Sequence, residues 1–285
     1  MDIFAQVIQE ISKVVLGKDR QVRQALCCLL ARGHLLIEDV PGVGKTTLSQ
    51  AFAKVTGLDY QRMQFTSDLL PSDILGVSIF DRNSNAFHFH AGPVFTQFLL
   101  VDEINRASPK TQSALLEAMA EKQVTIEGET RVLPAPFFVM ATQNPWFQSG
   151  TFPLPESQLD RFLMRISLGY PDELSERQLL AGGDPRAIIG QLRALLSAEK
   201  IISLQAMVDK IEIRDSVISY VQRLIAFTRQ DSHYAFGLST RAALALIQAA
   251  KAWAMLEGRE YVLPDDIQFL LEPVAAHRLK PAADN

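Results

Sequence analysis

From the start of the chain to about residue 171, short apolar runs alternate with stretches of helical periodicity. Four runs, at residues 35–37, 98–101, 137–142 and 164–168, are short and largely apolar, which predicts strands buried on both faces. Apolar residues at spacings of three and four predict helices in residues 2–15 and 19–32, and again after Lys45 and after Ser108. Short strands separated by helices predict an α/β fold, with a parallel sheet between helices.

The pattern changes after residue 171. From about residue 203 onward the periodicity is helical throughout, in residues 203–210, 214–229, 239–257 and 264–277. Residues 173–196 are also helical, but Gly182-Gly183-Asp184-Pro185 interrupts them and is the best candidate for a linker. The sequence therefore predicts an α/β domain over residues 1–171, a helical linker region over 172–200 and a smaller all-helical domain over 201–285.

Composition narrows the class of protein. Of the 285 residues, 48% are hydrophobic and 21% are charged, which is typical of a globular protein. A net charge of −4 and the lack of a Lys/Arg block disfavour a dedicated nucleic-acid binder. The sequence holds no apolar run long enough for a membrane span. Adjacent Cys27 and Cys28 are expected to be buried thiols, and the acidic start does not suit a signal peptide, so we expect a cytoplasmic protein.

The first apolar run leads into a glycine-containing loop and then a helix. Gly42 and Gly44 let such a loop curve closely around a polyphosphate, and the helix would direct its N-terminal N–H groups at the same anion. Lys45 could bridge the terminal phosphates, and the Thr46 hydroxyl could bind Mg²⁺. Asp39 stands where the usual pattern has glycine. We expect the nucleotide to be bound by Val40, Pro41, Gly42, Val43, Gly44, Lys45, Thr46 and Thr47.

Polar side chains end the next two strands. Asp102 and Glu103 follow residues 98–101, and the carboxyl ends of parallel strands are where such folds bind ligands. Asp102 is predicted to hold Mg²⁺ with Thr46, directly or through water, and Glu103 to polarise the attacking water. Asn144 could orient that water or contact the γ-phosphate; alternatively it caps a turn before Pro145.

Taken together, these residues resemble the AAA+ superfamily, and its MoxR family in particular. The similarity runs from residue 15 to residue 266, nearly the whole chain. Beyond the nucleotide motifs it is carried by EDVPG at 38–42, QFTSDLLPSDI at 64–74, GPVF at 92–95, DEINRA at 102–107 and GTFPLPE at 150–156. In the family, the first of these segments accounts for the missing glycine, and the second is expected to form an inserted loop.

The resemblance implies a homo-oligomeric ring, usually a hexamer, in which a neighbour's arginine completes each ATP site. Arg161, in Asp160-Arg161-Phe162, occupies the matching position, and Arg106 is the rival candidate. Arg241 matches the sensor arginine of the second domain. Ser239 is expected to cap its helix, and a cation in the first turn opposes the helix dipole unless an anion is bound nearby. Leu16 and Gly17 resemble the stretch that lines the adenine.

The implied activity is Mg²⁺-dependent ATP hydrolysis, with ATP bound between the two domains and Arg241 closing the lid domain over it. The implied task is chaperone-like remodelling or maturation of a partner protein complex. It can include insertion of a metal cofactor, and the partner can carry a von Willebrand factor A domain.

Two alternatives belong to other classes. The first is a nucleic-acid-stimulated AAA+ motor of the helicase type, because related rings grip nucleic acid with hairpins such as the one predicted at residues 123–136. Lys122 and Arg131 in this hairpin are offset by Glu127 and Glu129, which makes it a poor phosphate-binding surface. The second is a nucleotide-gated scaffold without hydrolysis, against which Glu103 argues.

Overall fold

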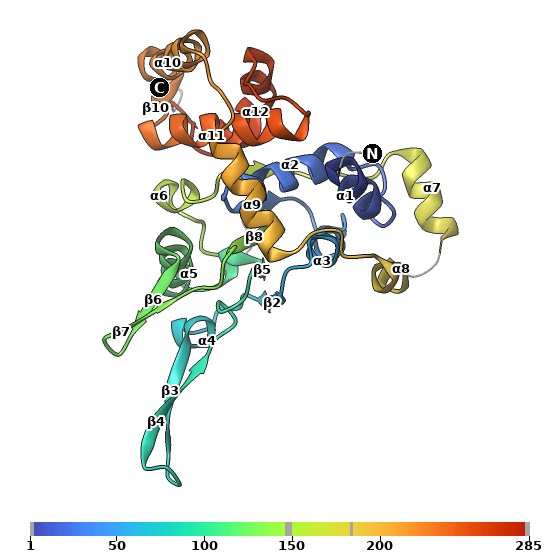
Figure 1. Ribbon diagram of the computed structural model, residues 1–285. Coiled ribbons are helices and arrows are strands. Elements are labelled where there is room, and N and C mark those ends of the chain that lie inside the picture. Colours follow the sequence, from blue (N-terminus) through green and yellow to red (C-terminus); the bar gives the residue numbers. More distant parts are fainter. Residues whose placement is uncertain (1–2, 146–149, 183–184, 283–285) are drawn as a thin grey trace.

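The computed structural model describes residues 3–145, 150–182 and 185–282 and is built on a five-stranded parallel sheet (Figure 1). In spatial order the strands are β2 (Tyr60–Gln64), β5 (Phe98–Asp102), β8 (Phe138–Gln143), β1 (Leu35–Glu38) and β9 (Met164–Ile166). The four strands expected from apolar runs are confirmed. Strand β2 was missed because it lies at an edge of the sheet and its side chains are largely exposed.

Both faces of the sheet are covered by helices, as an α/β fold requires. Leu35 and Ile37 of β1 point into a core formed with α1 (Ile3–Ser12), α2 (Asp19–Leu30) and α3 (Lys45–Thr56). Leu36 points into a second core with α5 (Pro109–Glu121), which Ser108 caps by accepting a hydrogen bond from the Thr111 N–H. This alternation follows from the two-residue period of a strand.

Helices make up most of the second half of the chain. They are α7 (Glu173–Ala181), α8 (Pro185–Gln191), α9 (Ala198–Asp209), α10 (Asp215–Gln230), α11 (Thr240–Leu256) and α12 (Pro264–Ala275). The lid lies against α2, where the Gln205 side chain donates to the Leu29 carbonyl at 2.8 Å and the Cys27 thiol to the Ala249 carbonyl at 3.3 Å. A short antiparallel pair, β10 (Tyr234–Phe236) with β11 (Lys280–Pro281), adds to the lid and was not indicated by the helical pattern.

We propose that the chain divides close to the boundaries expected from its sequence. The expected boundary at residue 200 falls inside α9, which begins at Ala198 and is capped by Ser197, so we place it before Ser197. Of the expected linker, residues 183 and 184 lie outside the described part of the chain. Among the described helices, none is both long and apolar enough to cross a membrane.

Two β-hairpins project from the same side of the core (Figure 1). The pair β6 (Gln123–Ile126) and β7 (Glu129–Val132) confirms the hairpin expected there. The pair β3 (Gly76–Asp81) and β4 (Ala86–Ala91) follows α4 (Pro71–Leu75), so the segment expected as an inserted loop leads into a hairpin that was missed. The Arg131 guanidinium lies 4.0 Å from the centre of the Phe89 ring and joins the two hairpins.

Candidate nucleotide site

The phosphate loop has the backbone geometry that its glycines predict. Gly42 and Gly44 have φ values of 88° and 91°, in the left-handed region where glycine is favoured. A side chain at either position would meet nothing within 4 Å, so the space above the loop is open to a ligand. Helix α3 begins directly after Gly44, so its first-turn N–H groups and its positive dipole end face that space.

Lys45 lies at the start of α3 and already contacts the groups expected around the γ-phosphate. Its ammonium donates to the Asp39 carbonyl at 2.5 Å and to Asn144 Oδ1 at 3.2 Å. Partial burial lowers the pKa of Lys45, and the carboxylates of Asp39, Asp102 and Glu103 act against this effect. The lysine, Asn144 and both carboxylates are therefore brought together at the carboxyl end of the sheet.

Asp102 and Glu103 are held by residues of the two neighbouring strands. The Thr142 hydroxyl of β8 donates to Asp102 Oδ1 at 3.3 Å and accepts from the Glu103 N–H at 3.0 Å. From β2, Arg62 Nε donates to Asp102 Oδ2 at 2.7 Å and Gln64 Nε2 donates to Glu103 Oε2 at 3.0 Å. Sequence reasoning missed Thr142, Arg62 and Gln64, although the register of a parallel sheet is what aligns them.

The Glu103 carboxylate is aimed by its backbone and by two further side chains. Its φ of 55° turns the chain sharply after β5, and η1 (Ile104–Arg106) follows. Asn144 Nδ2 lies 3.5 Å from Glu103 Oε1, and Arg106 Nη1 lies 3.2 Å from Glu103 Oε2. Arg106, the rival for the trans-acting arginine, is thus engaged with the carboxylate of its own chain.

Asp39 has a structural role that the sequence pattern did not reveal. Its buried carboxylate accepts hydrogen bonds from the Val40 N–H, the Ser167 hydroxyl and the N–H groups of Leu168 and Gly169, at 2.6 to 2.9 Å. Burial alone would raise the pKa of Asp39, but these hydrogen bonds outweigh it and the pKa is lowered. The residue in place of the usual glycine therefore ties the phosphate loop to the chain that leaves β9.

We expect Asp39→Asn to lower stability at neutral pH by roughly 2–3 kcal/mol, because it loses a charged acceptor of several hydrogen bonds. The folded pKa lies below the unfolded value of about 3.9, so the stabilisation is complete above that value. It is lost as the pH falls through the folded pKa. Thermal unfolding from neutral to acid pH measures this. Asp81→Asn, in an exposed turn with local partners, is the matched control, and equal melting shifts for both would contradict the role of Asp39.

Leu16 and Gly17 lie at the turn between α1 and α2, against the start of α7. A side chain on Gly17 would come within 2.5 Å of the Ser175 hydroxyl, and the φ of Gly17 is 68°. The Lys18 ammonium donates to the Tyr170 carbonyl at 2.7 Å. This turn and the segment held by Asp39 are therefore neighbours, and a base could lie beside them on the phosphate-loop side of the sheet.

Arg161 lies at the opposite end of the sheet from the phosphate loop of its own chain. Strands β1 and β9 are parallel, with Leu35 opposite Met164. The phosphate loop follows the carboxyl end of β1, whereas Arg161 precedes the amino end of β9. Arg161 Nη1 donates to the Leu116 carbonyl in α5 at 2.7 Å.

Arg241 accompanies Arg161 and not Lys45. Its guanidinium lies 3.6 Å from Asp160 Oδ2, and Asp160 is also held by the buried Arg278 at 2.6 Å. Ser239 caps the helix as expected, with its hydroxyl accepting from the Ala242 N–H. The expectation that Arg241 closes over ATP bound between the two domains of its own chain is therefore wrong, because the lid packs at the other end of the sheet.

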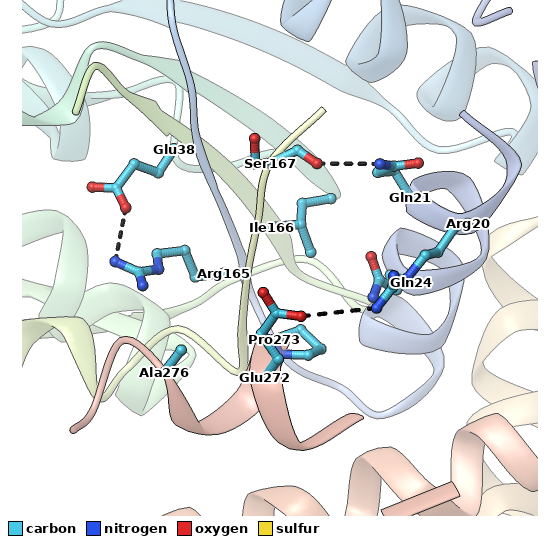
Figure 2. A pocket seen from close by; sticks show the side chains of 10 residues that line it. All are labelled: Arg20, Gln21, Gln24, Glu38, Arg165, Ile166, Ser167, Glu272, Pro273 and Ala276. Carbon is cyan, nitrogen blue, oxygen red and sulfur yellow. Dashed lines mark hydrogen bonds and ion pairs between the residues drawn. The ribbon is translucent and has the colours of Figure 1, made fainter. Parts of the chain in front are cut away.

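A cavity of about 260 Å³ lies between α2, the end of β9 and α12. Figure 2 shows that its charged side chains pair with one another, Glu38 with Arg165 at 2.7 Å and Arg20 with Glu272 at 3.9 Å. No residue of the phosphate loop lines the described walls of this cavity. It therefore offers no uncompensated positive charge to a triphosphate, and the open loop is the better nucleotide site.

The donor set suits Mg²⁺ that arrives with ATP. Mg²⁺ prefers oxygen ligands and is usually bound through one or two protein groups together with phosphates and water. Thr46 and Asp102 provide a hydroxyl and a carboxylate beside the phosphate loop. Within the described residues no cluster of three or more His, Cys, Asp or Glu side chains could hold a metal alone, which agrees with a cation shared with the nucleotide.

Comparisons with known proteins agree with this site. The model of the ATPase family associated with various cellular activities (AAA) matches residues 34–164, and the AAA lid domain model matches residues 226–285. The chain is 46% identical to YeaC of Bacillus subtilis over 97% of this chain and 87% of that protein. It is 42% identical to Chaperone MoxR1 of Mycobacterium tuberculosis over 96% of this chain and 74% of that protein.

A solved structure extends the similarity to three dimensions. The crystal structure of a candidate ATPase from Cytophaga hutchinsonii matches with a TM-score of 0.89 at 39% identity, over 99% of this chain and 88% of that one. The fold and the matches together define an ATPase of the AAA+ superfamily with a helical lid. Within that superfamily, the chain belongs to the MoxR family.

Proposed function

We propose that this chain hydrolyses Mg²⁺-bound ATP at sites shared between neighbouring copies of a ring, which we take to be a hexamer. The observation that supports this most strongly is the separation of Lys45 and Glu103 from Arg161 and Arg241 by the length of the sheet. One chain cannot bring both sets to one phosphate, but the loop of one copy and the arginines of the next can meet.

Each proposed role follows from the position of the side chain. The phosphate loop and Lys45 bind the phosphates, and Leu16 and Gly17 lie beside the base. Thr46 and Asp102 hold the Mg²⁺, which neutralises charge on the phosphate oxygens. Glu103 accepts a proton from the attacking water, and Asn144 orients it. Arg161 of the next copy stabilises the charge that develops on the transferred phosphoryl group, and its Arg241 reports on the γ-phosphate.

For Arg161 to reach the neighbour's site, its side chain must leave the Leu116 carbonyl. Asp160 lies next to Arg161 in sequence and pairs with Arg241 of the lid. A neighbour's phosphate that draws either arginine away would therefore also change how the lid is held. We propose this coupling as the switch that turns loss of the γ-phosphate into movement of the lid.

We further propose that the switch serves chaperone-like remodelling or maturation of a partner protein complex. A relative that shares 42% of its residues is a chaperone, and this supports a protein client. Insertion of a metal cofactor and a partner with a von Willebrand factor A domain remain part of the proposal through the MoxR resemblance. The helicase alternative has no comparable support, and Arg131 of the β6–β7 hairpin is engaged with Glu129 and Phe89.

A steady-state assay tests the proposal. The ATPase rate per chain should rise with protein concentration, because each site needs a neighbour, and should ignore duplex and single-stranded DNA. A rate per chain that stays flat over the concentration range would contradict shared sites. Stimulation by DNA would favour the helicase-type motor, whereas stimulation by a co-purified partner protein would support the chaperone-like role.

A further inference from the structure

Helices α10 and α11 of the lid border an apolar groove of about 320 Å³. Each helix contributes a stripe of residues spaced three or four apart, Ile218, Val221 and Ile225 from α10 and Ala243, Leu244 and Ile247 from α11. Leu244 keeps 63% of its surface exposed. Within the described residues the groove is thus an open apolar surface of the size that receives a helix of a partner.

Helix α7 has the complementary property. Leu174 and Leu180 are 76% and 84% exposed, and Ser175 is the only residue that α7 buries among the described residues. At 100° per residue, Leu174, Arg177 and Leu180 share the face opposite Ser175. A nine-residue helix is marginally stable alone, so its leucines are suited to packing against a partner.

These two surfaces lie beside the two halves of the proposed shared site. Helix α7 begins four residues after Gly169, which Asp39 holds beside the phosphate loop, and it contacts Gly17. The groove begins at Thr240, next to Arg241. Figure 1 shows α7 and α10 on opposite sides of the molecule, so one copy cannot join its own two surfaces. Two neighbouring copies joined at an ATP site would bring α7 of the first towards the groove of the second.

We propose that α7 of one copy docks into the α10–α11 groove of the next copy, with Leu174 and Leu180 as its apolar anchors. This rests on the proposed function, because it requires the ring. The contact joins different surfaces on the two copies, which is the arrangement that closes a ring. Charges also agree, since α7 carries Glu173 and Glu176 against Arg177, and Arg229 lines the groove.

Charge-swapped variants test this contact in chains that also carry Glu103→Gln, so that ATP stays intact. Leu180→Glu alone and Leu244→Lys alone should each raise the concentration for half-assembly with Mg²⁺ and ATP at least about tenfold, because each buries a charge against leucine. An equimolar mixture should restore assembly. In alternating rings, the introduced carboxylate meets the introduced ammonium at one contact and the other contact is unaltered. Sedimentation velocity measures this.

The matched control is Met207→Glu on α9, which is 49% exposed and belongs to neither surface. It should assemble as the Glu103→Gln parent does, and thermal melting should show that all variants fold, since every changed residue is exposed. If the parent never assembles, the ring of the proposed function is overturned. If the parent assembles and the single variants assemble equally well, the docking contact is overturned and the ring stands. If the single variants fail and the mixture does not recover, the pairing of α7 with the groove is overturned.

Discussion

A Glu103→Gln chain is expected to bind ATP as tightly as the wild type and to lose turnover by about 10²–10⁴-fold, the usual contribution of a general base. Glutamine keeps the size of the side chain and can still contact Gln64 and Asn144, but it cannot take a proton from water. The αL backbone of Glu103 and the hydrogen bond from its N–H to Thr142 do not depend on the carboxylate, so the site should keep its shape.

Fluorescent-nucleotide binding and single-turnover hydrolysis separate the two effects. Glu260→Gln, on an exposed residue of the lid, is the control and should leave both measurements unchanged. Turnover within about twofold of wild type for Glu103→Gln would remove Glu103 from the proton-transfer step, given the size of that contribution. Weak ATP binding would instead show that the carboxylate is needed to hold Lys45 and Asn144 in place.

Much of the core could be predicted because its signals are local. The apolar run at 98–101 and the two carboxylates after it correspond to β5 and its carboxyl end. Gly42 and Gly44 adopt the positive φ values that a phosphate loop needs, and these values depend on residues close in sequence. The β3–β4 hairpin was missed because apolar residues such as Phe80 and Phe87 stay exposed and give no one-sided pattern.

Contacts between distant parts of the chain could not be predicted in this way. Asp39 receives hydrogen bonds from residues 128 to 130 positions later, so its sequence neighbours show only that a glycine is absent. Arg62 reaches Asp102 only because β2 lies beside β5. A residue in an exposed edge strand carries no sequence signal for such a contact.

The position of the lid is the clearest case. The sequence identified Arg241 and the serine that caps its helix, but not the end of the sheet at which that helix lies. Contacts of α9 and α12 with the core decide this: Arg32 pairs with Asp209 at 2.8 Å, and His277 lies 3.0 Å from the Phe162 carbonyl. They hold Arg241 beside Asp160, and the role of Arg241 moves from its own ATP to the neighbour's.

Arg161→Ala is expected to lower turnover by about 10³–10⁵-fold, the range found for arginines that complete a phosphoryl-transfer site. ATP binding by the isolated chain should change little, because Arg161 lies far from its own phosphate loop. Mixing Arg161→Ala chains with Glu103→Gln chains should then restore activity that neither shows alone. In a random equimolar ring, about one quarter of the sites combine an intact Glu103 with an intact Arg161 from the neighbour.

The same mixing experiment separates Arg161 from Arg106. Arg106 contacts Glu103 of its own chain, so a loss caused by Arg106→Ala arises in the site that contains that Glu103. Arg106→Ala chains mixed with Glu103→Gln chains then form no intact site, and activity should not return at any ratio. Recovery with Arg106→Ala and none with Arg161→Ala would exchange the two roles. Recovery with Arg161→Ala alone would place the catalytic arginine at the amino end of β9, on the surface that each copy presents to the next.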